Sequence, residues 1–94
     1  MSAASEAVKA EATDEPKDIP FEFDGQKYNI LAGQPTPKAL EYLADYIVQD
    51  NSLYALLFVR EVIGQDQWDV WCQNHKAERV SDMMMATNDA YQGN

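Results

Sequence analysis

The chain is poor in the residues that build metal and cofactor sites. It has one cysteine, Cys72, and one histidine, His75. A single cysteine excludes an internal disulfide bond, so packing alone must hold the fold together. The two residues have the spacing of half a zinc site, but a structural zinc ion needs four ligands and the chain has no second pair. We therefore predict no metal and no cofactor, with a metal shared across a homodimer as the alternative.

Catalytic patterns are also scarce. The four glycines are isolated, and none precedes a lysine followed by Ser or Thr, which excludes a phosphate-binding loop. A nucleophile would need Cys72 or a serine to meet His75 and a third, orienting group. A histidine at a helix end in so short a chain has no evident pocket around it. The carboxylates fall on positions expected to face solvent. These features predict a protein without catalytic residues.

The chain has few basic residues. Sixteen acidic side chains against seven basic ones give a net charge of −9, and the basic residues are not clustered. Binding to nucleic acid or to anionic membranes depends on clustered Lys and Arg, so we predict neither partner. The longest apolar run, Leu53 to Val59, is far below the ~18 residues of a membrane span, and no signal-peptide pattern begins the chain. A cytoplasmic protein with a protein partner is expected.

The length of 94 residues predicts one compact unit with disordered ends. Residues 1–18 are built from Ala, Ser, Glu, Lys, Thr, Asp and Pro, with Val8 the sole large aliphatic residue after Met1. Such a segment buries too little apolar surface to order, so we predict a disordered acidic arm. It serves as a solubilising tail or, alternatively, orders on a partner. The compact domain is predicted over 19–91, with a frayed tail over 92–94.

The clearest local signal lies in residues 19–30. Asp24-Gly25 is a two-residue hairpin turn of the kind that needs positive φ. If the turn closes there, one face of the hairpin is apolar and carries Ile19, Phe21, Phe23, Tyr28 and Ile30. Glu22 and Lys27 then meet on the other face as an expected ion pair. Because an isolated hairpin is only marginally stable, the apolar face must pack on another element.

The rest of the chain predicts a compact bundle of about four short helices, over 37–49, 52–63, 66–74 and 77–91. Thr36-Pro37 supplies an N-cap and a first-turn proline for the first helix. The apolar residues of this helix form one stripe, which we expect to cover the hairpin: Leu40, Leu43, Ala44, Ile47 and Val48. The second helix is apolar nearly all round, and Gly64 ends it. The predicted fold class is mainly α with a small N-terminal β-hairpin (α+β).

Apolar side chains exceed what so small a bundle can hide. Trp68 and Trp71 lie on the short third helix, and three successive methionines point across more than half of the fourth helix. At least one methionine must lie at the surface or in a contact with another molecule. The alternative is that two fill gaps under the tryptophans and the last is simply exposed. Since methionine adapts to irregular apolar shapes, we predict a flank that contacts a client protein or a second copy: Trp68, Trp71, Met83, Met84, Met85 and Tyr91.

Four segments follow one another in order: Phe21-Glu-Phe-Asp-Gly-Gln-Lys-Tyr-Asn-Ile30, a leucine-rich helix, Val62-Ile-Gly-Gln-Asp-Gln-Trp68, and a short helix before a closing one. This order, over about 20–91, resembles the small tail assembly chaperones that long-tailed (siphovirus-type) bacteriophages, particularly those of actinobacterial hosts, encode beside the tape measure gene. The resemblance implies a non-enzymatic protein of the host cytoplasm. It would bind and solubilise the tape measure protein and help recruit tail tube subunits.

Two other functions remain open from the sequence. One is a structural virion component, such as a head–tail connector or tail subunit. The other is an acidic inhibitor or adaptor that imitates nucleic acid, which only the charge of −9 suggests. Such a mimic needs carboxylates spaced along one face, whereas those of this chain are dispersed among the arm, the hairpin and the helices. We therefore rank the acidic inhibitor below the virion component.

Overall fold

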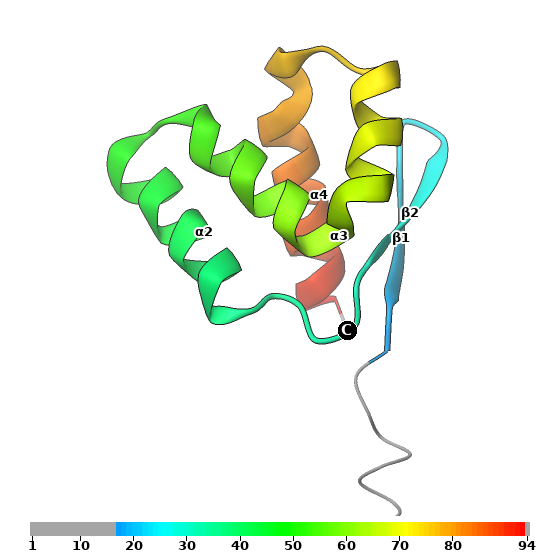
Figure 1. Cartoon of the computed structure of the whole chain (residues 1–94), viewed down its shortest axis with the longest axis horizontal. Helices are drawn as coiled ribbons and strands as arrows, with labels where there is room; N and C mark the ends of the chain where they lie inside the picture. Colours follow the sequence, from blue (N-terminus) through cyan, green and yellow to red (C-terminus); the bar gives the residue numbers. More distant parts are fainter. Residues whose placement is uncertain (1–16, 94) are drawn as a thin grey trace, which may run out of the picture.

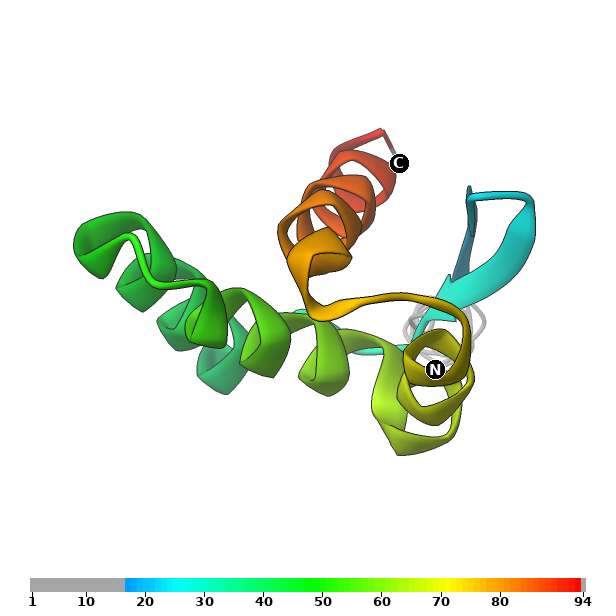
Figure 2. The same ribbon diagram turned by 90° about the horizontal axis from the view of Figure 1, so that it is seen from above.

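The computed structural model describes residues 17–93 and is mainly helical, with one small hairpin, as the sequence predicts. Its elements follow in the order β1 (Ile19–Phe23), β2 (Gln26–Ile30), α2 (Pro37–Gln49), α3 (Ser52–Asn74), the 3₁₀ helix η1 (Ala77–Arg79) and α4 (Val80–Gln92). The first half of α3 runs antiparallel to α2, and the hairpin lies at the other end of the molecule (Figure 1). Seen from above, α4 lies between α2 and the hairpin, on one side of α3 (Figure 2).

The predicted ends of the domain need two corrections. The acidic arm was expected over 1–18, of which 1–16 lie outside the described residues. Asp18 belongs to the folded part, because its Oδ1 accepts a hydrogen bond of 2.9 Å from the Ala32 N–H. At the other end α4 continues through Gln92, so this residue is helical and not part of a frayed tail.

The hairpin has the predicted register. Ile19 pairs with Ile30 and Phe21 with Tyr28, and the turn lies at Asp24-Gly25. Both turn residues have positive φ, 50° and 81°, which is the backbone that a tight two-residue hairpin needs. Glu22 and Lys27 are opposite each other in this register, but within residues 17–93 they form no ion pair. Both are exposed, where holding two long side chains together gains little.

The apolar face of the hairpin packs on α3 and α4, and not on α2 as predicted. A glutamine of α3 also holds the outer edge of β2. Gln67 accepts a hydrogen bond of 2.8 Å from the Asn29 N–H and donates one of 2.7 Å to the Asn29 carbonyl. The side-chain amide thus pairs with Asn29 as a neighbouring strand would, and Pro20 stands opposite Asn29 on β1. The hairpin is fixed to the second half of α3.

The predicted second and third helices form one element, so the described residues contain three α-helices and not about four. The element α3 is nevertheless broken at Gly64, whose φ of 86° and ψ of 162° are not helical. Beside the break, the Leu31 N–H donates a hydrogen bond of 2.9 Å to the Val62 carbonyl. This bond joins the end of the hairpin to the end of the first half of α3.

The last helix begins later than predicted. Residues 77–79 form the 3₁₀ turn η1, and α4 starts at Val80 instead of Ala77. The residues at the two N-cap positions, Lys76 and Arg79, form no side-chain capping bond. Their side chains carry only donors, so they cannot satisfy the free N–H groups of a helix start.

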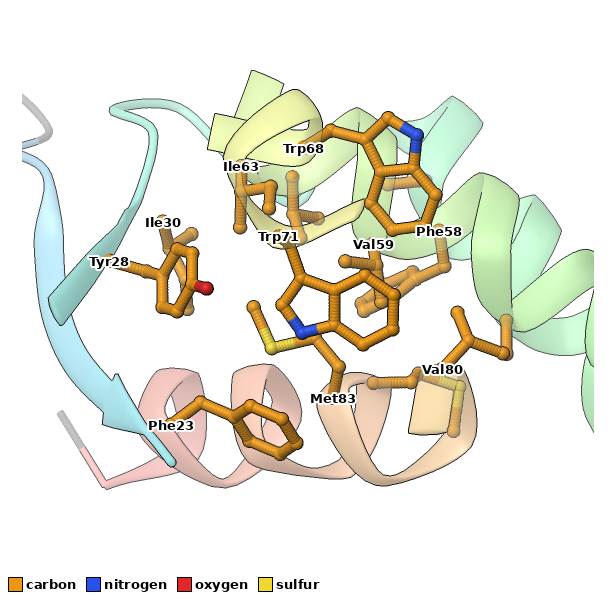
Figure 3. Packing of buried hydrophobic residues seen from close by; sticks show 14 residues of the cluster. Phe23, Tyr28, Ile30, Phe58, Val59, Ile63, Trp68, Trp71, Val80 and Met83 are labelled. Atoms are coloured by element: carbon orange, nitrogen blue, oxygen red, sulfur yellow. The ribbon is translucent and has the colours of Figure 1, made fainter. Parts of the chain in front are cut away.

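One core joins the hairpin, α3 and α4. Trp71 lies at its centre, with Phe23 and Tyr28 from the hairpin on one side and Val80 and Met83 from α4 nearby (Figure 3). The Tyr28 hydroxyl is buried there and has no hydrogen-bond partner among the described residues. Burial also raises the pKa of Tyr28, and the negative charge of Asp24 raises it further.

Replacing Gly64 by alanine should destabilise the fold by about 2 kcal/mol, because its backbone lies in a region that is essentially restricted to glycine. An added Cβ would also lie 2.8 Å from Leu31 Cδ1, so that side chain would have to move. Gly33→Ala is the matched control, since its φ is also +86° but nothing lies within 4 Å of the added Cβ. We expect Gly64→Ala to lower the Tm by roughly 10 °C and Gly33→Ala by less, as measured by circular dichroism. An equal fall in Tm for the two variants would contradict the special requirement for glycine at the break in α3.

Replacing Tyr28 by phenylalanine should leave the free energy of unfolding at pH 7 unchanged or higher, because it removes a buried hydroxyl without a partner. In the wild type, the raised pKa of Tyr28 affects the free energy of unfolding in a pH-dependent way. Its contribution is constant below the pKa of an unfolded tyrosine, about 10, and is lost as the pH rises through the higher pKa of the folded state. Urea unfolding at pH 7 and at pH values above 10 measures both effects, and the variant should lose less stability at the alkaline end. A clear loss at pH 7 would show that the hydroxyl is bonded after all.

Candidate functional site

The structure splits the six residues predicted to bind a partner. Met83 is fully buried, with 0% of its surface exposed, whereas Met85 is 58% exposed. Of the other four, only one is exposed, Tyr91, and three are buried: Trp68, Trp71 and Met84. The expectation that at least one methionine lies at the surface is confirmed. The expected continuous flank does not form, because four of its six members belong to the core.

The tryptophans are buried because their helical spacing puts both indole rings on the side of α3 that faces the core. The rings of Trp68 and Trp71 stack at 5.2 Å between centroids, and Trp71 stacks on His75 at 4.7 Å. Phe23 of the hairpin lies against both Trp71 and His75. Of the two indole rings, that of Trp71 contacts Phe23 and so helps to hold the hairpin in place.

His75 is engaged in holding the hairpin turn. Its Nδ1 lies 3.0 Å from the Trp71 carbonyl oxygen and its Nε2 lies 3.1 Å from a carboxylate oxygen of Asp24. Both partners accept hydrogen bonds, so the ring makes both bonds when each nitrogen carries a proton. Arg79 donates to the two oxygens of the same carboxylate at 3.0 and 3.1 Å and lies over the Phe23 ring. Asp24 thereby connects the turn to α3 and η1.

Cys72 does not have the surroundings of a nucleophile. Partial burial raises the pKa of its thiol, and the negative charge of Asp69 raises it further. Reactive cysteines need the opposite shift, usually from a nearby positive charge. Within residues 17–93, no three His, Cys, Asp or Glu side chains are placed to hold a metal ion together.

None of the helices described here has the length and apolar content to cross a membrane.

The largest departure from the predicted surface is on α2. Its apolar stripe was expected to cover the hairpin, but Leu40, Ile47 and Val48 are 49%, 69% and 81% exposed. Ala44, between them along the helix, is exposed as well. We call the surface formed by Leu40, Ala44, Ile47 and Val48 the α2 face.

The α2 face is open because α2 buries a different side. Ala39 is buried, and three further residues pack half-buried against the core: Tyr42, Leu43 and Tyr46. At ~3.6 residues per turn, this side and the α2 face together cover more than half of the helix surface. The first half of α3 covers only part of such a wide apolar arc. The two tyrosines were the missed signal, because they extend the arc beyond what one neighbouring helix can bury.

A pocket of about 160 Å³ lies next to the α2 face. Its walls come from β2, from the connector before α2 and from three helices. They include Ile30, Pro35, Leu40 and Leu43, Phe58 and Val62 of α3, and Asn88 and Tyr91 of α4. We call it the α2–α4 pocket. Leu40 belongs to both surfaces, so the pocket and the α2 face are continuous. Of the six residues predicted to bind a partner, Tyr91 alone lines this pocket.

The surroundings of this site are acidic. The segment from Pro37 to Asp50 contains one basic residue, Lys38, against three acidic ones: Glu41, Asp45 and Asp50. On α4, Asp89 lies beside the pocket residue Asn88 in the chain. None of these four carboxylates forms an ion pair within residues 17–93. An open apolar surface with unpaired negative charges around it is suited to binding another molecule.

Comparison of the chain with protein-family models, with curated proteins and with solved structures finds no match.

Replacing Met83 and Met85 separately by glutamine should give opposite results, although the change of side chain is the same. Met83→Gln buries an amide in the core and should cost about 2 kcal/mol or more, with a fall in Tm of roughly 10 °C. Met85→Gln changes an exposed position and should stay within about 0.5 kcal/mol of the wild type. Thermal unfolding followed by circular dichroism measures both. Similar Tm values for the two variants would contradict the burial of Met83.

Proposed function

We propose that this chain is a phage tail assembly chaperone, which binds and solubilises the tape measure protein and assists assembly of the tail tube in the host cytoplasm. The observation that supports this most directly is the α2 face beside the α2–α4 pocket. Ile47 and Val48 are 69% and 81% exposed in a small protein that has a continuous core elsewhere. An apolar surface of this kind is typical of a site that another protein covers.

The charge of the chain supports the same function. A net charge of −9 on 94 residues keeps copies of the protein apart and opposes precipitation. A chaperone of this kind must cover apolar segments of its client and add charge to the complex. The α2 face supplies the apolar contact, and the carboxylates around it supply the charge.

A structural virion component is the second candidate, because an open apolar face also suits a permanent contact in a particle. The two functions differ in where the protein ends up. A chaperone leaves the tail when assembly is complete, whereas a structural subunit stays in a fixed ratio to the other subunits. Mass spectrometry of purified particles separates them, and stoichiometric amounts of this chain in the particle would favour the virion component.

Co-expression with a tape measure protein from the genome that encodes this chain tests the chaperone function. We expect the soluble fraction of the tape measure protein to rise several-fold and the two proteins to elute together on size exclusion, because the open apolar face covers client segments that otherwise aggregate. An unrelated acidic protein of similar size and charge is the control for a general effect of co-expression. An unchanged soluble fraction of the tape measure protein would sink the proposed function.

A further inference from the structure

We infer that the α2 face and the α2–α4 pocket together bind one amphipathic α-helix of the client, an inference that rests on the proposed function. The helix inserts one large apolar side chain into the pocket and lays its apolar stripe along α2. Lys or Arg residues on its flanks face the carboxylates of Glu41 and Asp45.

The spacing of the α2 residues fits a helical partner. Leu40, Ala44 and Ile47 of the α2 face lie at i, i+4 and i+7, and the half-buried Leu43 at i+3 borders them. Four residues at these positions form the hole that receives a side chain of a facing helix. Leu40 and Ile47 project at the two ends of this set, while Ala44 is small. A small residue at such a place lets two helices approach to the usual 8–10 Å or so between axes.

The pocket fits one large side chain. Its volume of about 160 Å³ is close to that of an apolar cavity of roughly 150 Å³ that holds a benzene molecule in another protein. Leu43, Phe58 and Val62 give it an apolar floor, and the half-buried Asn88 stands at its α4 wall. A phenylalanine or leucine of the partner would fill it and bury its ring or methyl groups among these residues.

The charges select a basic helix over a second copy of this chain. Glu41 and Asp45 follow the α2 face along the helix and have no ion-pair partner within residues 17–93. Lys38, the basic residue of α2, lies over the Tyr42 ring at 6.0 Å. A second copy would bring the same carboxylates and the same net charge of −9 to the contact. Lys or Arg on the partner would instead be attracted, which also speeds association.

The hairpin does not offer an equivalent site for a strand. Strand addition needs free N–H and C=O groups along a sheet edge. On β2, the N–H and C=O groups of Asn29 are both bonded to Gln67 at 2.8 and 2.7 Å. On β1, Pro20 has no N–H to donate. A helix on the α2 face is therefore favoured over a strand on the hairpin.

The test uses designed peptides on the order of 20 residues, long enough to be helical when bound. The first has leucines at helical spacing, one central phenylalanine and flanking lysines. The second has glutamates in place of the lysines, the third has alanine in place of the phenylalanine, and the fourth is a scrambled sequence. We expect fluorescence anisotropy to show binding of the first peptide to the full chain, with affinity about tenfold or more lower for the other three.

Variants of the protein locate the contact. Ile47→Asp and Ala44→Gln should each weaken the first peptide about tenfold, because one removes an apolar contact and the other fills the hole on α2. Ile47→Lys should weaken it further than Ile47→Asp, since it adds repulsion to the same apolar loss. Val70→Asp is the control, because Val70 is an exposed apolar residue on the second half of α3. All four variants should keep a Tm close to that of the wild type.

The outcomes separate this inference from the proposed function. If the wild type solubilises the tape measure protein and the α2 variants do so equally well, the binding site is wrong and the chaperone function stands. If the first peptide binds as described but the tape measure protein stays insoluble, the site stands and the function fails. Equal binding of the lysine and glutamate peptides overturns the charge selection. A dimer in sedimentation that Ile47→Asp dissociates would assign the α2 face to a second copy and overturn the inference.

Discussion

The break of α3 at Gly64 is the constraint on which the rest of the fold depends. With a φ of 86° and a ψ of 162°, this residue ends one helical segment and starts another in a new direction. The second segment carries Trp71 to the hairpin, with Trp68 stacked behind it in the core, and α4 packs on the hairpin and on α3. The first segment packs on α2 and contributes Phe58, Val59 and Val62 to the core under α4. The hydrogen bond of 2.9 Å from the Leu31 N–H to the Val62 carbonyl fixes the end of the hairpin beside this break. The two segments of α3 therefore share one core but have different neighbours.

The open α2 face follows from this division. Because the hairpin packs on α3 and α4, it is not available to cover α2. The α2 helix has one principal neighbour, α3, and the side with Ala39, Leu43 and Tyr46 packs on the core. A helix with a wider apolar arc than one neighbour can cover must expose the remainder. The candidate site is therefore a consequence of the topology and of the composition of α2 together.

Local signals made the hairpin and the bounds of α2 predictable. They did not predict which side of a helix faces the core. Asp24-Gly25 fixes the turn, and the turn fixes the register, so the apolar face of the hairpin followed from counting residues. The stripe on α2 was recognised correctly as apolar but assigned to the core, because spacing alone does not tell which of two apolar sides meets the neighbour. The tryptophans were placed at the surface for a similar reason. The burial of Trp71 depends on its contacts with Phe23 and His75, and the Asp24–His75 contact that accompanies them joins residues 51 positions apart.

The net negative charge opposes the self-association that the open α2 face favours. An exposed stripe such as Leu40, Ala44, Ile47 and Val48 would favour self-association in a neutral protein. Here each copy carries a net charge of −9, which acts over about 8–10 Å at ordinary ionic strength and opposes the approach of a second copy. The same field attracts a partner of opposite sign. Once a basic helix arrives, the apolar contact with α2 and the filling of the α2–α4 pocket hold it, because short-range burial does not depend on the charge that brought it there. The carboxylates thus attract the partner, and the apolar residues of α2 and the pocket hold it. Because different residues do the two tasks, a small protein can remain monomeric and still bind an apolar client.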